Sequence, residues 1–162
     1  MDESLEQRVK SLEQKVRSLE QEVRRLTAIE EIRRLKARYF WAVDMKKWDM
    51  FADLFTEDLQ IDFAESTTKP QTRDEFVRSA AKHFEGAISV HHGHIPEIEI
   101  IDDTHARGIW PMFDLVETPE DSPYVSHAGY GHYIEEYRKE DGRWKIARTR
   151  LTRIKRVVLD RK

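Results

Sequence analysis

Residues 89–98 read SVHHGHIPEI and place three of the chain's seven histidines within four positions of a segment otherwise typical of a β-strand. Histidine is the side chain whose unperturbed pKa lets it both accept and donate a proton near neutral pH. On the inner face of a sheet, a histidine is a general base, a metal ligand or a hydrogen-bonded core residue. Because successive strand residues point to opposite faces, only one of His91 and His92 can face inward.

The elements expected around this segment are helices first and strands afterwards. Apolar residues on one helical arc over 29–43, a short apolar group near Trp48 and a capping box at 72–75 predict three helices. Asp141-Gly142 predicts a tight hairpin. Strands are predicted over 58–63, 87–94, 97–101, 104–117, 125–139 and 143–159. This order predicts an α+β fold in which a strongly curved antiparallel sheet wraps over helices.

The N-terminal segment carries a different pattern, an unbroken heptad repeat with valine at a and leucine at d. Its members are Leu5, Val9, Leu12, Val16, Leu19, Val23 and Leu26. Such a stripe is typical of a coiled coil, and valine at a with leucine at d favours two strands. Arg8 and Lys15 fall at g, and Glu13 and Glu20 fall at e. In a parallel pair these positions attract, whereas an antiparallel pair would bring like charges together.

Two domains are therefore expected, a coiled-coil oligomerisation helix over 1–27 and a globular α+β domain over 28–162. The alternative is one long amphipathic helix that folds back on its own domain. The heptad predicts a parallel homo-oligomer and is compatible with a dimer.

Composition narrows the function classes. The net charge of -3 and the pI of about 6.2 give no electrostatic case for binding nucleic acid. The chain has no cysteine, which excludes disulfides and thiolate zinc sites. No apolar run approaches the ~20 residues of a membrane span, and the N-terminus lacks the apolar region of a signal peptide. We expect a cytoplasmic protein without a membrane or nucleic-acid partner.

Strand alternation singles out a further carboxylate. Asp114 shares its face with Trp110, Met112 and Val116 in the predicted strand 104–117. Burying a lone charge is costly unless it is paired. Asp114 is therefore either salt-bridged to an arginine at a strand end or placed in a pocket as an acid or a substrate anchor.

Two residues of the predicted helix over 29–43 and its end are candidates to act with a histidine. Asp44 could fix the tautomer of a nearby imidazole and stabilise its cation. Tyr39 lies on the core-facing arc and could donate a hydrogen bond to an oxyanion. The alternatives are an ion pair of Asp44 with Lys46 or Lys47, and a purely structural Tyr39.

A metal site would need several histidines to converge. The candidates are His92, His94, His127 and His132. No His-Glu-x-x-His or Glu-x-x-His companion is present, so the pattern favours a general base over a metal ligand.

These motifs together resemble a known group. Ile29-Glu30-x-Ile32, then Tyr39-Phe40 and Asp44, the segment 89–98 and the terminal hairpin resemble SnoaL-like proteins of the nuclear-transport-factor-2-like superfamily, to which scytalone dehydratase is related. Within that group the chain is most similar to the bile acid 7α-dehydratases. The resemblance implies a cone-shaped α+β barrel with an apolar pocket, and a trimer as in the dehydratase branch.

The resemblance also implies roles for individual residues. Tyr39, Asp44, His91 and Asp114 fall on catalytic positions, and Arg153 on a position that pairs with a pocket carboxylate or holds substrate. The expected pocket lining consists of Phe40, Trp48, Phe63, Trp110 and Met112. The implied activity is removal of water from a hydrophobic, steroid-like or bile-acid-like substrate by His–Asp acid–base catalysis, without cofactor or metal. The alternatives are an isomerase or cyclase of a polycyclic ketone, and an oligomer that binds a hydrophobic ligand without catalysis.

Overall fold

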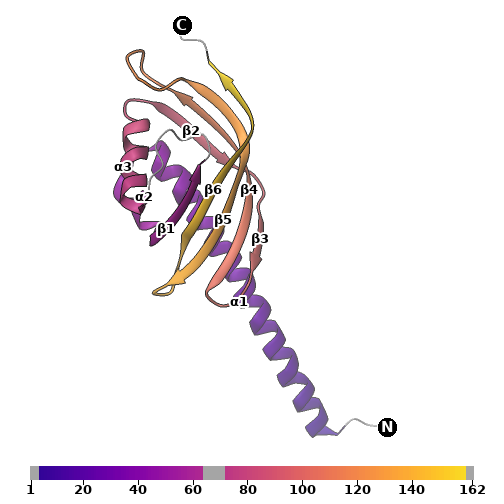
Figure 1. The fold of residues 1–162 in the computed structure, drawn as a ribbon. Coiled ribbons are helices and arrows are strands. Elements are labelled where there is room, and N and C mark those ends of the chain that lie inside the picture. Colours follow the sequence, from indigo (N-terminus) through magenta and orange to yellow (C-terminus); the bar gives the residue numbers. More distant parts are fainter. Residues whose placement is uncertain (1–3, 64–71, 160–162) are drawn as a thin grey trace.

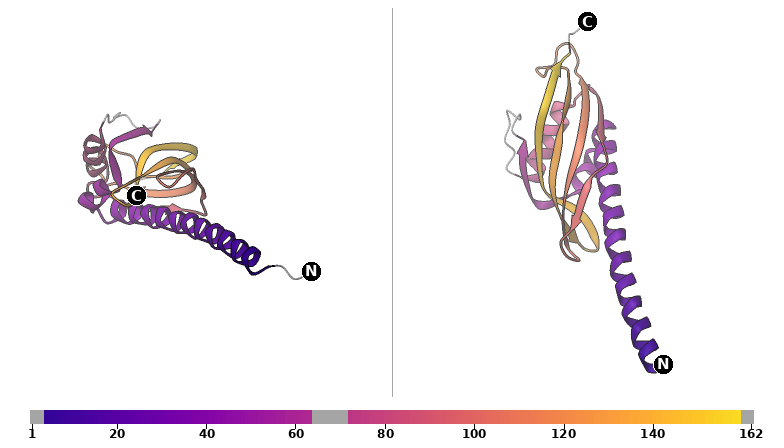
Figure 2. Two further views of the ribbon diagram at one scale, coloured as in Figure 1. Left: turned by 90° about the horizontal axis from the view of Figure 1, so that it is seen from below. Right: turned by 90° about the vertical axis from the view of Figure 1, so that its right-hand side faces the viewer.

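The computed structural model describes residues 4–63 and 72–159, and its elements follow the predicted order (Figure 1). They are α1 (Leu5–Asp44), α2 (Trp48–Asp53), β1 (Phe55–Phe63), α3 (Arg73–His83), β2 (Ile88–Gly93), β3 (Glu97–Ile100), β4 (His105–Glu117), β5 (His127–Glu140) and β6 (Arg143–Val158). The helices lie on one side of a single curved sheet (Figures 1 and 2). The predicted α+β class is therefore confirmed.

The sheet has the strand order β1-β6-β5-β4-β2, with β3 also paired to β4. Strands β2 to β6 pair antiparallel as predicted, but β1 runs parallel to β6. A short hairpin forces antiparallel pairing, whereas a long connection permits parallel pairing. The chain between β1 and β6 contains α3 and four strands, which makes the parallel edge possible. The sheet is curved but does not close, because β1 and β2 are its two ends.

The edge of the sheet beside β4 is one strand broken in two. Gly93 of β2 pairs with Met112, and Glu97 of β3 pairs with Ile109. Between them, His94 still donates its backbone N–H to the carbonyl of Pro111 over 2.8 Å. Proline interrupts a ladder because it has no N–H to donate. The ladder of hydrogen bonds is interrupted before Pro96, so that β2 ends at Gly93 and β3 begins at Glu97.

Helix α1 is continuous across the predicted domain boundary at residues 27 and 28. Its first half projects beyond the sheet (Figures 1 and 2). Its second half packs against the domain through Ala28, Ile32, Leu35, Lys36, Tyr39, Ala42 and Val43. The helix begins at a capping box, in which Ser4 and Gln7 exchange side-chain-to-backbone hydrogen bonds.

The core lies between these helices and the inner face of the sheet. Phe51 of α2, Phe55 of β1 and Phe76 of α3 are buried together, with ring centroids 4.9 Å and 5.6 Å apart along this chain of contacts. At the far end of the sheet, Asp141 and Gly142 have φ of 48° and 75°, which fits the predicted hairpin turn. Within the described part of the chain, no helix combines the length and the apolarity that crossing a bilayer would require.

Candidate active site

His91 and Asp44 form a hydrogen-bonded pair where β2 meets the end of α1. Nδ1 of His91 lies 2.7 Å from Oδ1 of Asp44, and the backbone N–H of His91 donates to Oδ2 over 2.9 Å. The Ser89 hydroxyl donates to Oδ1 over 3.1 Å. Because a carboxylate only accepts, Nδ1 carries the hydrogen and Nε2 is left to take a proton. A general base needs this orientation and tautomer.

The end of α1 fixes the Asp44 carboxylate in place. The backbone N–H groups of Lys46 and Lys47 donate to carbonyls of the last turn in a Schellman pattern. Lys46 has a φ of 56°, a conformation that costs a non-glycine residue about 1–3 kcal/mol. Its Nζ then donates to Ser89 Oγ over 2.7 Å, and to the backbone oxygen of Asp44 over 3.2 Å. Lys46 thus supports the site through Ser89, and the expected alternative of a direct Asp44 carboxylate pair is not what forms.

Asp114 and Arg153 form a second buried pair on the inner face of the sheet. Arg153 Nη1 and Nη2 contact the two carboxylate oxygens over 2.9 Å and 2.6 Å. Asp114 pairs across strands with His91. The two-pronged contact is the strong geometry for guanidinium and carboxylate. Both carboxylate oxygens of Asp114 are already engaged as acceptors by this guanidinium. The pair is therefore better suited to provide a local electrostatic field or to bind a polar group of the substrate than to act as a general acid.

Gly129 of β5 leaves the space through which the Arg153 side chain crosses this strand to reach Asp114. A Cβ placed on Gly129 would overlap the guanidinium of Arg153 and the carboxylate of Asp114. Only a residue without a side chain leaves this space open.

We expect Gly129→Ala to lower the free energy of unfolding by about 1–3 kcal/mol, because the added methyl displaces the buried ion pair. Urea denaturation followed by circular dichroism measures the loss. Ala128→Ser is the matched control, since Ala128 is the neighbour on the opposite face of β5. Equal stability of Gly129→Ala and the wild type would mean that Arg153 does not need this route.

Tyr39 lies deep in the same interior, next to a tyrosine that sequence reasoning did not single out. The rings of Tyr39 and Tyr133 meet edge-on, with centroids 5.7 Å apart. Burial raises the pKa of Tyr39 well above its ordinary value, with the nearby Tyr133, Glu135 and Asp114 adding to the effect. Both phenols therefore stay neutral and keep hydrogens that can be donated to an oxyanion.

A fully buried ion pair, Lys36 with Glu135, lies next to the Tyr133 ring. Lys36 of α1 donates to Glu135 of β5 over 2.5 Å, and neither side chain is exposed. Glu135 also accepts from the hydroxyls of Tyr137 (2.7 Å) and Thr149 (3.1 Å). The ammonium group lies 3.7 Å from the centroid of the Tyr133 ring, which is within range of a cation–π contact. Burial lowers the pKa of Lys36, and Glu135 opposes that change.

The four histidines considered as metal ligands lie on both faces of the sheet. His92 and His94 are exposed, and His132 lies on the face of β5 opposite to the buried His127. Among residues 4–63 and 72–159, no three carboxylate or histidine side chains converge as a metal site would require. His127 Nδ1 lies 3.0 Å from the carbonyl of Val125 instead.

His83, at the end of α3, adds a second imidazole near the site. Its ring lies 4.4 Å from that of Tyr124. Burial lowers the pKa of His83 to about 4, and interactions with His127, Arg156 and His91 act in the same direction. His83 is therefore neutral at pH 7, and sequence reasoning did not identify it.

This pKa predicts acid sensitivity. Between pH 6.5 and 4 the unfolded chain binds the proton that folded His83 excludes, so the free energy of unfolding falls as the pH falls through this range. We expect His83→Gln to lose less stability than the wild type between pH 7 and pH 4.5, as measured by urea midpoints. His94→Gln, at an exposed position, should behave like the wild type. An equal loss in His83→Gln and the wild type would contradict the prediction.

The residues expected to line the pocket divide into two groups. Trp110 and Met112 are buried on the inner face of β4, and the half-buried Phe40 and Phe63 lie near them, with rings 6.1 Å and 6.3 Å from the ring of Tyr133. Trp48 instead borders a surface hollow of about 420 Å³, together with Lys46 and Phe84.

Phe84 connects this hollow to the histidine. Its ring stands edge-on to His91, with centroids 5.4 Å apart. Phe84 therefore borders the hollow and also contacts the imidazole of His91.

Four interacting residues were missed in the sequence: Lys36, His83, Tyr133 and Glu135. The two on β5 could have been found, because His127, Gly129, Gly131, Tyr133, Glu135 and Tyr137 alternate along that strand and face inward. Lys36 had no such signal. A lysine within an amphipathic helix is normally at its solvent edge, and only the position of Glu135 across the core places it inside.

Residues 24–150 match the model of the SnoaL-like domain. The chain belongs to the SnoaL-like family. Family membership confirms that part of the resemblance seen in the sequence, while the particular closeness to bile acid 7α-dehydratases is not part of this result.

Solved structures share the fold. A candidate scytalone dehydratase from Novosphingobium aromaticivorans matches with a TM-score of 0.75 and 21% identity, over 86% of this chain and 92% of that one. A hexachlorocyclohexane dehydrochlorinase from Novosphingobium barchaimii gives 0.70 and 18%, over 85% and 94%. A protein of unknown function from Mycobacterium tuberculosis gives 0.67 and 25%, over 80% and 73%. At these identities the likeness establishes the fold of this SnoaL-like chain.

Proposed function

We propose that this SnoaL-like protein is a cofactor-independent lyase that removes water from a hydrophobic hydroxylated carbonyl compound. The observation that carries the proposal is the 2.7 Å contact between His91 Nδ1 and the Asp44 carboxylate. It supplies an oriented imidazole within a largely buried site. The names of two similar structures, a candidate scytalone dehydratase and a hexachlorocyclohexane dehydrochlorinase, support the reaction class, since both names denote eliminations.

In the proposed reaction, Nε2 of His91 takes a proton from the carbon next to the carbonyl or at its conjugated position. Asp44 stabilises the resulting imidazolium. The carbonyl oxygen becomes enolate-like and accepts a hydrogen bond from the phenol of Tyr39 or its partner Tyr133. Nε2 then returns the proton to the departing hydroxyl, so that one C–H and one C–O bond break, a C=C bond forms and water leaves. The Asp114–Arg153 pair balances charge beside the imidazole.

The substrate that fits this chemistry best is a steroid-like or bile-acid-like ring system. Aromatic and sulfur-containing side chains lie in the apolar core near the site, and pockets that bind ring systems are lined by side chains of this kind. These residues are Phe40, Phe63, Trp110 and Met112. The resemblance to bile acid 7α-dehydratases points to the same class.

A substrate screen tests the proposal. The protein is incubated with 3-oxo-Δ4 steroids that carry a hydroxyl one conjugated position away, as free acids and as coenzyme A thioesters. We expect a new long-wavelength absorbance from extended conjugation, together with the loss of one water in the product mass. The same steroids without the hydroxyl are the matched controls.

Two other results would replace this proposal. A product of unchanged mass with a moved double bond would mean an isomerase that uses the same base. Saturable binding without any change in mass or absorbance, across the whole panel, would mean a ligand-binding protein.

A further inference from the structure

The first half of α1 carries a stripe of apolar side chains that the rest of the described chain leaves exposed. The seam, as we call it, consists of Leu5, Val9, Leu12, Val16, Leu19, Val23 and Leu26, whose exposed fractions run from 45% at Val9 to 76% at Leu5. Single exposed apolar residues are ordinary, but a contiguous apolar stripe marks an interaction surface. The seam therefore needs a partner.

The seam faces away from the domain to which it is attached. Leu35, which packs against the sheet, follows Leu26 by about two and a half helical turns and so lies on the opposite side of α1. A helix that docks on the seam would leave the contacts of the second half of α1 undisturbed. The next a and d positions are Glu30 and Arg33, which are polar and lie outside the core. The apolar surface thus ends where the domain begins.

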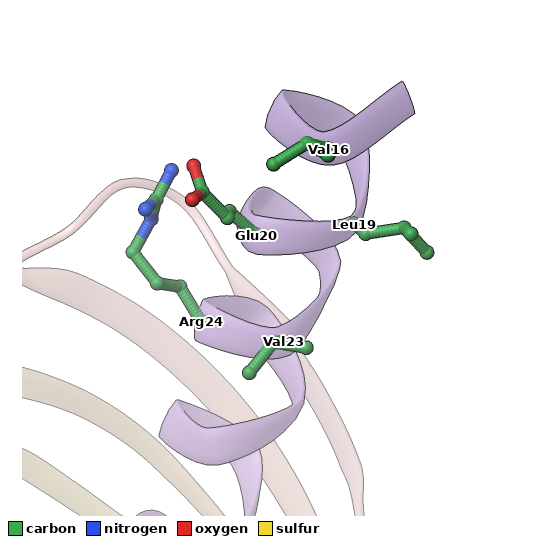
Figure 3. Close-up of a pocket in the computed structure, with 5 residues that line it drawn as sticks. All are labelled: Val16, Leu19, Glu20, Val23 and Arg24. Carbon is green, nitrogen blue, oxygen red and sulfur yellow. The ribbon is translucent and has the colours of Figure 1, made fainter. Parts of the chain in front are cut away.

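The surface of the seam has the shape that a second helix requires. A hollow of about 400 Å³ is bordered by Val16, Leu19, Glu20, Val23 and Arg24 (Figure 3). In a coiled coil, each a or d side chain inserts into a hole formed by four residues of the facing helix. Two a residues, the d residue between them and the next e residue form one such hole here. The hollow therefore lies where a leucine of a neighbouring seam would insert.

The charges beside the seam specify its partner and direction. Arg8 and Lys15 at g would face Glu13 and Glu20 at e of a parallel second copy, each five residues further along. In an antiparallel pair, the e positions would place glutamates against glutamates. The third g residue, Glu22, is held by Arg25 of its own helix over 2.8 Å.

We propose that residues 5–26 form a parallel, two-stranded coiled coil with a second copy of this chain. The partner is the same chain because the charges beside the seam are self-complementary in a parallel pair, Arg8 with Glu13 and Lys15 with Glu20. Valine at a with leucine at d favours two strands over three. Because α1 is one helix from Leu5 to Asp44, the coil places both domains at the same end. This inference is independent of the proposed activity.

Cysteine cross-linking tests the direction, and the natural absence of cysteine makes the experiment clean. Leu12→Cys and Leu26→Cys are made separately in the full chain. In a parallel pair each new thiol meets its own copy, so both variants should oxidise mostly to linked pairs. Gln21→Cys, at f on the far side of the helix, is the control and should stay unlinked. An antiparallel pair would set each of these leucines against a valine of the other copy, so neither variant would link to itself. The absence of linkage above the control would therefore overturn the proposal.

Charge reversal gives a second test, read out as mass by light scattering and as a dissociation constant by sedimentation. The wild type should have the mass of two chains. Glu13→Lys with Glu20→Lys reverses four pairs in a parallel dimer and should raise the dissociation constant at least about tenfold. Adding Arg8→Glu and Lys15→Glu to the same chain should restore it. A wild-type mass of one or three chains, or no effect of the reversal, would overturn the two-stranded parallel form.

Discussion

Replacing His91 with asparagine is expected to lower kcat/KM by about 10²–10⁴-fold, the usual contribution of a general acid–base group. The asparagine amide nitrogen can take the place of Nδ1 and still donate to Asp44, but nothing replaces Nε2. The variant therefore removes the proposed proton carrier and keeps the contact that holds the site together. Turnover is measured on the substrate that the absorbance screen identifies, and thermal unfolding reports whether the fold is retained.

The neighbouring residue provides an unusually close control. His92 is exposed on the other face of β2, where its ring lies 6.1 Å from that of Phe113. His92→Asn makes the same chemical change one position away and should leave kcat/KM within about twofold of the wild type, because it touches no residue of the proposed reaction. If His91→Asn kept wild-type turnover, His91 would not be the base, and the His–Asp pair would be a structural contact.

The second large effect is expected on stability. We predict that Lys36→Met lowers the free energy of unfolding by about 3–5 kcal/mol, because it leaves the Glu135 carboxylate buried without a counter-charge. Neither side chain of this pair is exposed to water. Lys10→Met is the matched control on the same helix, since Lys10 is exposed and its contact with Glu6 spans 3.7 Å. Urea denaturation followed by tryptophan fluorescence measures both variants.

A double variant separates charge from packing. Lys36→Met with Glu135→Gln removes both charges. The amide oxygen can still accept from the Tyr137 hydroxyl, and the amide N–H2 can donate to the Thr149 hydroxyl. We expect it to recover part of the stability lost in Lys36→Met, because the cost of an unpaired buried charge is gone. If the double variant were no more stable than the single one, the loss would come from packing around the methionine. A loss below about 1 kcal/mol in Lys36→Met would contradict the role of the pair altogether.

The order of elements was accessible in the sequence because each one rests on a local signal. Three local signals act over a few residues each: the heptad segment is helical, Thr72 caps the start of α3, and the turn at Asp141-Gly142 forms where it was predicted. The boundaries shifted by a few residues at most, except that 58–63 extends back to Phe55. The parallel pairing of β1 with β6 was not predicted, because the register between distant strands has no local signature.

For the candidate site, too, some features could be predicted from the sequence and others depend on the fold. Strand parity alone showed that only one of His91 and His92 faces inward and that Asp114 shares its face with Trp110 and Met112, since side chains alternate with a period of two. The resemblance to SnoaL-like proteins selected His91 and added Arg153 to the candidates Tyr39 and Asp44. The contacts among them depend on how α1 crosses the sheet and on the space above Gly129, and neither can be computed from spacing along the chain.

What the sequence by itself determined is the set of local preferences: an exposed apolar seam on the first half of α1, a helices-then-strands order and one inward histidine in residues 89–98. What only the tertiary structure decided is which charges meet. Lys36 faces Glu135 across 99 residues of chain, and Arg153 reaches Asp114 across β5. Helix and strand periodicity act through neighbours a few positions away, whereas ion pairs in a core depend on the packing of whole elements. The buried polar contacts of this SnoaL-like domain are therefore a property of its three-dimensional fold.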